Sequence, residues 1–159
     1  PIKSSAASDV YKRQVRLSMG YPDSDAECKM LLNRSGKNPL NSVNCIVSKI
    51  EFLEMQSEVQ NVFVSDDMAR YIVSLISATR RHPLLSRGAS PRATLSLTDM
   101  AKAVAFAEGR DYIVPRDVQN IFICTVNHRI ILNAKASASK KNSEEILHEI
   151  LRKTPKPRT

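Results

Sequence analysis

The chain has 159 residues, the size of one domain or slightly more. Apolar residues make up 42% and aromatic residues only 5%, with no Trp, so the core must be aliphatic, which favours packed helices over a β-sandwich. The formal charge of +8 lies at the two ends, since residues 17–128 hold equal numbers of basic and acidic residues; this argues for charged tails rather than the basic face of a nucleic-acid reader.

The first 22 residues precede the predicted helical body. Residues 1–14 are small, polar and aperiodic and resemble a translated sequencing adapter, so we interpret them as a non-native or disordered segment. The stretch VRLSMGYP at 15–22 predicts an extended linker that ends in a turn. We therefore expect a helical domain over 23–153 and a tail over 154–159.

Three helices are predicted in the first half of this domain. The first covers about 23–33. Ser48 and Glu51 form a capping box for the second, which ends near Val62 and has its apolar face at Phe52, Met55, Val59 and Val62. Ser65 caps the third, which runs to about Arg80 and buries Met68, Ile72, Leu75, Ile76 and Thr79. Short extended links are expected at 62–64 and 112–114.

The second half predicts three further helices. Residues 84–89 are predicted as a loop. Ser90 and Pro91 then start a helix that Gly109 ends, with an apolar face at Leu97, Met100, Ala101, Val104 and Ala107. Pro115 starts the next, with Val118, Ile121, Phe122 and Thr125 inward. KASASKKN at 135–142 is predicted as a flexible loop, and Ser143 caps the last helix. The predicted fold is an all-α bundle of about five to six helices.

No catalytic constellation or metal site is predicted. The histidines are far apart in sequence and share no motif: His82, His128 and His148. The cysteines lack metal-ligand spacing, and their odd number argues against a disulfide framework. We expect Cys28, Cys45 and Cys124 to be buried apolar side chains of a cytoplasmic protein, because a reducing compartment keeps thiols free. No apolar stretch approaches the ~20 residues of a membrane helix.

Arg92 is the residue that departs from a local rule. It lies in the first turn of the helix that begins at Pro91, where a cation opposes the helix dipole at a cost of roughly 0.3–1 kcal/mol. The same helix end attracts anions, and a guanidinium there could bind a phosphate with its planar fork. The alternative is an arginine that points into solvent or pairs with a nearby carboxylate.

Three other arginines lie close to Arg92 in sequence. Arg80, Arg81 and Arg87 flank the same predicted loop and form the only basic cluster of the otherwise neutral body. Arg80 and Arg81 also suit the C-terminus of the preceding helix, where cations are favoured. That reading explains the pair without a ligand and leaves Arg92 unexplained.

An ordered series of motifs resembles the C-terminal segment of MoxR-type AAA+ ATPases. The series consists of LSMGYP at 17–22, FLEMQSEVQNVFVSDD at 52–67, ATR at 78–80, HP at 82–83, GASPRA at 88–93, EGRDY at 108–112, VPRDV at 114–118, HRIIL at 128–132 and a final EEILHEIL. The resemblance covers about residues 15–158. An Asp-Arg-Phe run that the family has before the linker is absent from Tyr11–Gln14.

The resemblance implies a lid domain that completes a nucleotide site. It places the family's sensor-2 arginine, which reports the γ-phosphate of ATP, on Arg92, with Ser90 and Arg80 as further candidates for nucleotide contact. ATP is the implied cofactor, with Mg²⁺ held by an ATPase core upstream of Val15. The lid alone is not expected to be catalytic. The resemblance further implies a homo-oligomeric, hexameric ring and chaperone-like remodelling, with von Willebrand A domain proteins as partners.

Two other functions stay open at this point. The basic ends and the pI of 9.6 would suit a helical nucleic-acid-binding module. Apolar helix faces would suit a protein-interaction module. Neither reading gives Arg92 a role.

Overall fold

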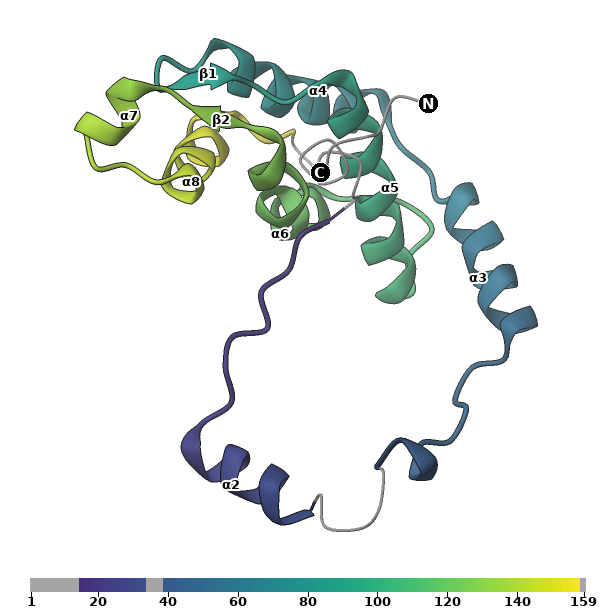
Figure 1. Ribbon diagram of the computed structural model, residues 1–159. Coiled ribbons are helices and arrows are strands. Elements are labelled where there is room, and N and C mark those ends of the chain that lie inside the picture. Colours follow the sequence, from purple (N-terminus) through teal and green to yellow (C-terminus); the bar gives the residue numbers. More distant parts are fainter. Residues whose placement is uncertain (1–14, 34–38, 158–159) are drawn as a thin grey trace, which may run out of the picture. The chain divides into compact units, whose positions relative to one another are not determined.

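The chain folds into two compact units, which are described separately. The computed structural model describes residues 15–33 and 39–157 (Figure 1). Of the described residues, 17–33 and 39–56 form one unit, and 15–16 together with 57–157 form the other. The predicted all-α class is confirmed, because helices dominate the described residues and the only sheet there has two short strands. Among these residues no helix combines the length and apolar character of a membrane span. The predictions for residues 1–14 and for the end of the tail lie outside the described part.

The smaller unit contains helices without a core. It comprises α2 (Ser24–Asn33), the 3-10 turn η1 (Pro39–Ser42) and most of α3 (Lys49–Asn61), and neither α2 nor α3 has a buried residue. The predicted capping box of α3 is confirmed: the Glu51 amide donates to Ser48 Oγ at 3.2 Å, and the Ser48 amide donates to Glu51 Oε2 at 2.7 Å. The predicted apolar face of α3 is covered only at its far end, since Phe52 is 54% exposed and Val62, just past the helix, is 4% exposed.

The larger unit is a helical bundle. It is built from α4 (Asp66–Arg81), α5 (Pro91–Ala107), α6 (Pro115–Val126) and α8 (Ser143–Lys153), with α5 and α6 forming the most extensive pair. Ser65 caps α4 as predicted and accepts a hydrogen bond from the Met68 amide at 3.3 Å. The predicted inward faces of α4 and α6 are confirmed by burial.

The predicted face of α5 was wrong in part. Leu97 and Ala101 are buried, but Ala107 is exposed and Met100 and Val104 are only partly covered. The buried row is Ala93, Leu97, Ala101 and Ala105, at spacings of four. Small side chains on this row let α6 approach closely, which favours this face over the bulkier neighbouring one.

Two short extended pairings tie the bundle together. The predicted links at 62–64 and 112–114 meet in a parallel bridge: the Phe63 amide donates to Asp111 O at 2.7 Å, and the Ile113 amide donates to Phe63 O at 3.2 Å. The prediction of a plain loop at 84–89 was wrong, because β1 (Leu85–Arg87) pairs antiparallel with β2 (Ile131–Leu132). A three-residue strand is too short to display an alternating pattern.

Three further predictions need correction. The stretch predicted as a flexible loop contains most of α7 (Ala134–Ala138), because Asn133 Oδ1 accepts from the Ala136 amide at 3.1 Å and Ala136 is fully buried. Asn142, not Ser143, caps α8. Cys28 and Cys45 are exposed, and Cys124 is only partly covered. The first two lie in the unit that lacks a core, where no apolar environment can bury them.

Candidate functional site

The loop between β1 and α5 lies directly against the end of α4. Gly88 makes this possible: a Cβ at this position would lie 2.5 Å from both the Cα and the N of Arg80, and 2.7 Å from the carbonyl carbon of Thr79. These are backbone atoms that cannot rotate away. Gly88 is therefore required by the close approach of the loop to α4.

Ala89 is held on both sides by the last turn of α4. Its amide donates to Thr79 Oγ1 at 2.9 Å, and its carbonyl accepts from Arg80 Nε at 2.7 Å. The Thr79 hydroxyl in turn donates to Ile76 O at 2.7 Å, so both of its hydrogen-bonding functions are used in the interior. This arrangement brings together the ATR and GASPRA motifs, which are nine residues apart, and fixes where α5 begins.

Arg92 projects from the first turn of α5. Its side chain is exposed, and no carboxylate among the described residues lies within ion-pair distance of it. Ser90 is the N-cap residue as predicted, but its side chain makes no capping hydrogen bond. The first turn of α5 contains no acidic residue. The N-terminus of α5 is thus left without an anionic partner from the described part of the chain.

The start of α6 provides an internal comparison. It also begins with Pro-Arg, at Pro115 and Arg116, but the next residue is Asp117, whereas α5 has Ala93 at the matching position. Asp117 Oδ2 accepts from the Val114 amide at 2.8 Å and closes the N-terminus of α6 with a carboxylate. The same Pro-Arg start therefore occurs at two helix N-termini, one of which has a carboxylate partner from the chain (α6) and one of which has none among the described residues (α5).

Arg110 neutralises the carboxylate of Asp117. Its guanidinium donates to both Asp117 oxygens, at 2.8 and 2.6 Å, and to Glu108 at 2.6 Å. Burial alone would raise the pKa of the Asp117 carboxyl, but the hydrogen bonds from Arg110 and Val114 outweigh it and hold that pKa below its ordinary value. The EGRDY and VPRDV motifs are therefore joined by a structural ion pair.

Arg129 is a basic residue near Arg92 that the sequence reasoning missed as a site residue. It lies in η2 (Asn127–Arg129), is only 5% exposed and donates through Nη2 to Ser96 Oγ at 3.0 Å, one turn along α5 from Arg92. Burial lowers the pKa of Arg129, and the charge of Arg92 lowers it further. The positive charges of Arg92 and Arg129 thus lie near the same end of α5. The HRIIL motif contained Arg129 but carried no signal of its burial.

The other predicted candidates divide clearly. Arg80 is exposed at the end of α4, and its Nε donates to Ala89 O. The side chains of Arg81 and Arg87 are exposed and make no hydrogen bond to the described residues. His128 is buried beside Arg129, and its Nε2 accepts from Arg129 Nε at 3.3 Å. No group of three metal-ligating side chains occurs among the described residues.

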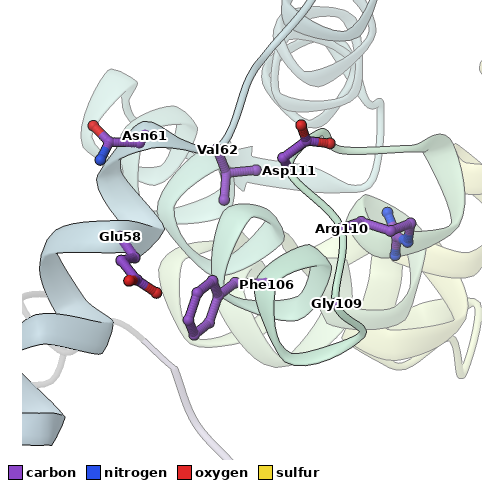
Figure 2. Close-up of a pocket in the computed structure, with 7 residues that line it drawn as sticks. All are labelled: Glu58, Asn61, Val62, Phe106, Gly109, Arg110 and Asp111. Atoms are coloured by element: carbon purple, nitrogen blue, oxygen red, sulfur yellow. The ribbon is translucent and has the colours of Figure 1, made fainter.

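A mostly apolar pocket lies at the opposite end of α5. It has a volume of about 370 Å³ and is lined by Glu58, Asn61, Val62, Phe106, Gly109, Arg110 and Asp111. Figure 2 shows the Phe106 ring and the Glu58 carboxylate facing the same space, with the Arg110 guanidinium turned toward α6. Because Arg110 is already paired with Asp117, the pocket offers a phosphate no free cation, only carboxylates that would repel it.

Comparison with known proteins assigns the bundle to a family. Residues 77–150 match the AAA lid domain. The chain is 35% identical over 136 residues to the uncharacterized protein YeaC of Bacillus subtilis, covering 86% of this chain and 42% of YeaC. It is 29% identical over 151 residues to the chaperone MoxR1 of Mycobacterium tuberculosis, covering 89% of this chain and 40% of that protein.

A solved structure agrees with these relatives. A crystallised candidate ATPase from Cytophaga hutchinsonii superposes with a TM-score of 0.83 at 32% identity, covering 96% of this chain and 49% of its own. The chain thus spans less than half the length of each of these proteins. Residues 77–150 form an AAA lid domain, and the chain belongs with the MoxR-like AAA+ proteins.

Proposed function

We propose that this chain is the regulatory lid of an AAA+ ATPase and that Arg92 contacts the terminal phosphate of ATP bound mainly by an ATPase core. The observation that carries the proposal is the open N-terminus of α5. Arg92 is exposed there without a carboxylate partner among the described residues, whereas the matching end of α6 is closed by Asp117. A helix N-terminus and a guanidinium both favour an anion.

The mechanism follows from the charge of the nucleotide. A triphosphate at the start of α5 would be attracted by Arg92, by the first-turn amides and by the buried charge of Arg129. Ser90 would offer its uncapped hydroxyl, and Arg80 the N–H groups that Ala89 leaves free. Loss of the γ-phosphate removes the anion that Arg92 binds, so the lid is free to reorient relative to the core. Mg²⁺ belongs to the proposed core.

The smaller unit supports the proposal of a core. It exposes many large apolar side chains, among them Leu31, Ile50, Phe52, Leu53 and Met55, and buries none in α2 or α3. Apolar surface of this kind marks a contact with another body. An ATPase core of the same protein is the occupant that the length of the relatives favours, since the chain spans about 40% of two of them.

The wider setting is part of the same proposal. We infer that the whole protein forms a homohexameric ring and remodels partner proteins in a chaperone-like way. Proteins with von Willebrand A domains would be among these partners. A cytoplasmic location is supported by the exposed free thiols of Cys28 and Cys45, which suit a reducing compartment.

Arg92→Ala in the protein that joins this lid to its core tests the proposal. ATP turnover should fall on the order of 10²-fold, the loss typical of removing one transition-state donor. Arg116→Ala is the matched control, because Arg116 is exposed at the same position of α6 beside the carboxylate of Asp117. Equal turnover in the Arg92→Ala variant and the wild type would exclude the sensor role.

A protein-interaction module is the second candidate, and the pocket at the end of α5 favours it. Its apolar wall contains Val62 and Phe106, and its rim carries Glu58 and Asp111, so it suits an apolar side chain flanked by basic residues. A fluorescent peptide of that composition should bind the chain and lose affinity in the Glu58→Gln/Asp111→Asn variant. Binding that is equal in the two proteins would remove this candidate.

A further inference from the structure

The contacts of the 88–90 loop suggest how Arg92 is held in place. Arg92 lies three residues after Ala89, and no residue between them is bound by its side chain to the rest of the bundle: the Ser90 hydroxyl makes no capping bond, and Pro91 has no amide hydrogen. On the loop side, the position of the first turn of α5 therefore depends on the anchor at Ala89, while the buried Ala93 holds the turn on the core side. That anchor consists of two bonds, from Arg80 Nε and to Thr79 Oγ1, and of the close contact at Gly88.

We propose that Thr79 and Arg80 are positioning residues for Arg92, which clamp the Gly88–Ala89 loop to the end of α4. The proposal rests on the function proposed above and extends it to the transmission of the nucleotide state. Because the clamp joins the start of α5 to the end of α4, a pull on Arg92 is carried first to α4. The other end of α4 continues through the link at 62–64 into α3.

The geometry separates a positioning role of Arg80 from a charge contact with the nucleotide. The bond to Ala89 O comes from Nε, the guanidinium nitrogen that is bonded to the Cδ methylene, at 2.7 Å. A lysine keeps the positive charge but places a methylene group where this N–H lies, since its nitrogen is one atom further along the chain. Arg80→Lys should therefore behave as a loss if Arg80 positions the loop, and as a near wild type if its charge contacts phosphate.

Thr79→Val gives an independent perturbation of the same loop. It keeps the shape of the fully buried side chain but removes the oxygen that accepts from the Ala89 amide. Thr98→Val is the matched control, since Thr98 Oγ1 on α5 donates only to Thr94 O, at 3.0 Å, one turn away on the same helix. Arg81→Lys is the control for Arg80→Lys, because Arg81 is its exposed neighbour at the end of α4.

The first measurement is amide hydrogen exchange over residues 86–93 in the 159-residue chain. Thr79→Val and Arg80→Lys should each speed exchange in this segment about tenfold while exchange in α6 and α8 stays unchanged, because a local opening has become easier. The two controls should leave the segment as in the wild type. Unchanged exchange in both test variants would overturn the clamp without reference to nucleotide.

The second measurement is a double-mutant cycle in the protein that joins the lid to its core. In the protein with Arg92 intact, Thr79→Val and Arg80→Lys should each lower kcat about tenfold or more. A displacement near 1 Å of a positioned group can cost up to 10²-fold in rate. In the Arg92→Ala background Thr79→Val should add no further loss, because the fully buried Thr79 can act on the nucleotide only through Arg92. Equal losses in the two backgrounds, or a wild-type kcat for Arg80→Lys, would overturn the inference while the sensor role stands. No loss for Arg92→Ala itself would refute the proposed function and with it the coupling.

Discussion

Gly88→Ala is the sharpest stability test of the contact between the loop and α4. The new Cβ would lie 2.5 Å from two backbone atoms of Arg80, whereas unbonded carbon atoms are comfortable at about 3.5–4.0 Å. The loop would have to retreat by about 1 Å. That shift would stretch the 2.7 and 2.9 Å bonds of Ala89 beyond useful hydrogen-bond length, which ends near 3.2 Å.

The size of the effect follows from these contributions. Overpacking against a rigid neighbour costs about 1–3 kcal/mol, and each of the two lost hydrogen bonds costs about 1 kcal/mol. The reduced freedom of the unfolded chain returns about 0.4–1 kcal/mol, because alanine has fewer conformations than glycine. We expect the free energy of unfolding to fall by about 2–5 kcal/mol.

Urea unfolding of the 159-residue chain, followed by circular dichroism, measures this loss. The midpoint should fall at an unchanged m-value, which would place the effect in the folded state. Gly109→Ala is the matched control: Gly109 has φ +73°, and a Cβ there would meet open space, so alanine costs only the left-handed backbone penalty of about 1–2 kcal/mol. A smaller loss for Gly88→Ala than for Gly109→Ala would refute the steric argument.

Three further outcomes are expected. Asp117→Asn should lower the free energy of unfolding by about 3 kcal/mol in the same urea assay, because it leaves Arg110 without its buried partner. The control Asp99→Asn, at an exposed position, should change the free energy of unfolding by less than about 0.5 kcal/mol. Lys141 and Lys153 lower the pKa of Glu149 to about 2, and Arg110 helps to hold the pKa of Asp117 below its ordinary value. Both carboxylates therefore stabilise the fold at pH values above their unfolded pKa, and this stability should be lost as pH falls from about 4.5 toward 2. In the Glu149→Gln variant, the free energy of unfolding should depend less steeply on pH over this range. Any binding of DNA should weaken steeply with salt and disappear when residues 1–14 and 154–159 are removed; saturable binding that survives the truncation would favour a nucleic-acid-binding module instead.

The helix starts could be predicted because local residues determine them. Ser48, Ser65, Ser90 and Pro115 each mark a helix start within one residue of its observed position, since capping depends on atoms three residues away. The inward face of α5 could not be predicted in the same way. Met100 and Val104 are more apolar than Ala105, but the closeness of α6 selects the small residues, and that closeness is a property of the packed pair.

The contacts at the site depend on pairs far apart in the chain. A cation at the end of a helix predicts an interaction with that helix's own carbonyl groups, yet Arg80 donates to Ala89, nine residues away in the next loop. Burial of Arg129 beside Ser96 joins residues 33 positions apart. Local periodicity carries no information about either contact, so the sequence predicts for Arg80 only a helix C-terminus or a nucleotide contact, and for Arg129 no role.

The two Pro-Arg helix starts indicate why an anion for α5 must come from outside the described bundle. At α6, the third helical residue is Asp117, and its carboxylate reaches back to the Val114 amide while Arg110 neutralises it. At α5, the same position is Ala93, which is as fully buried as Asp117 but carries no carboxylate. A lid that carried its own anion at this position would compete with a nucleotide for Arg92. Because Ala93 has no carboxylate, the helix end stays open to an external anion and Arg92 stays unpaired within the described bundle, which is the condition that a phosphate sensor requires.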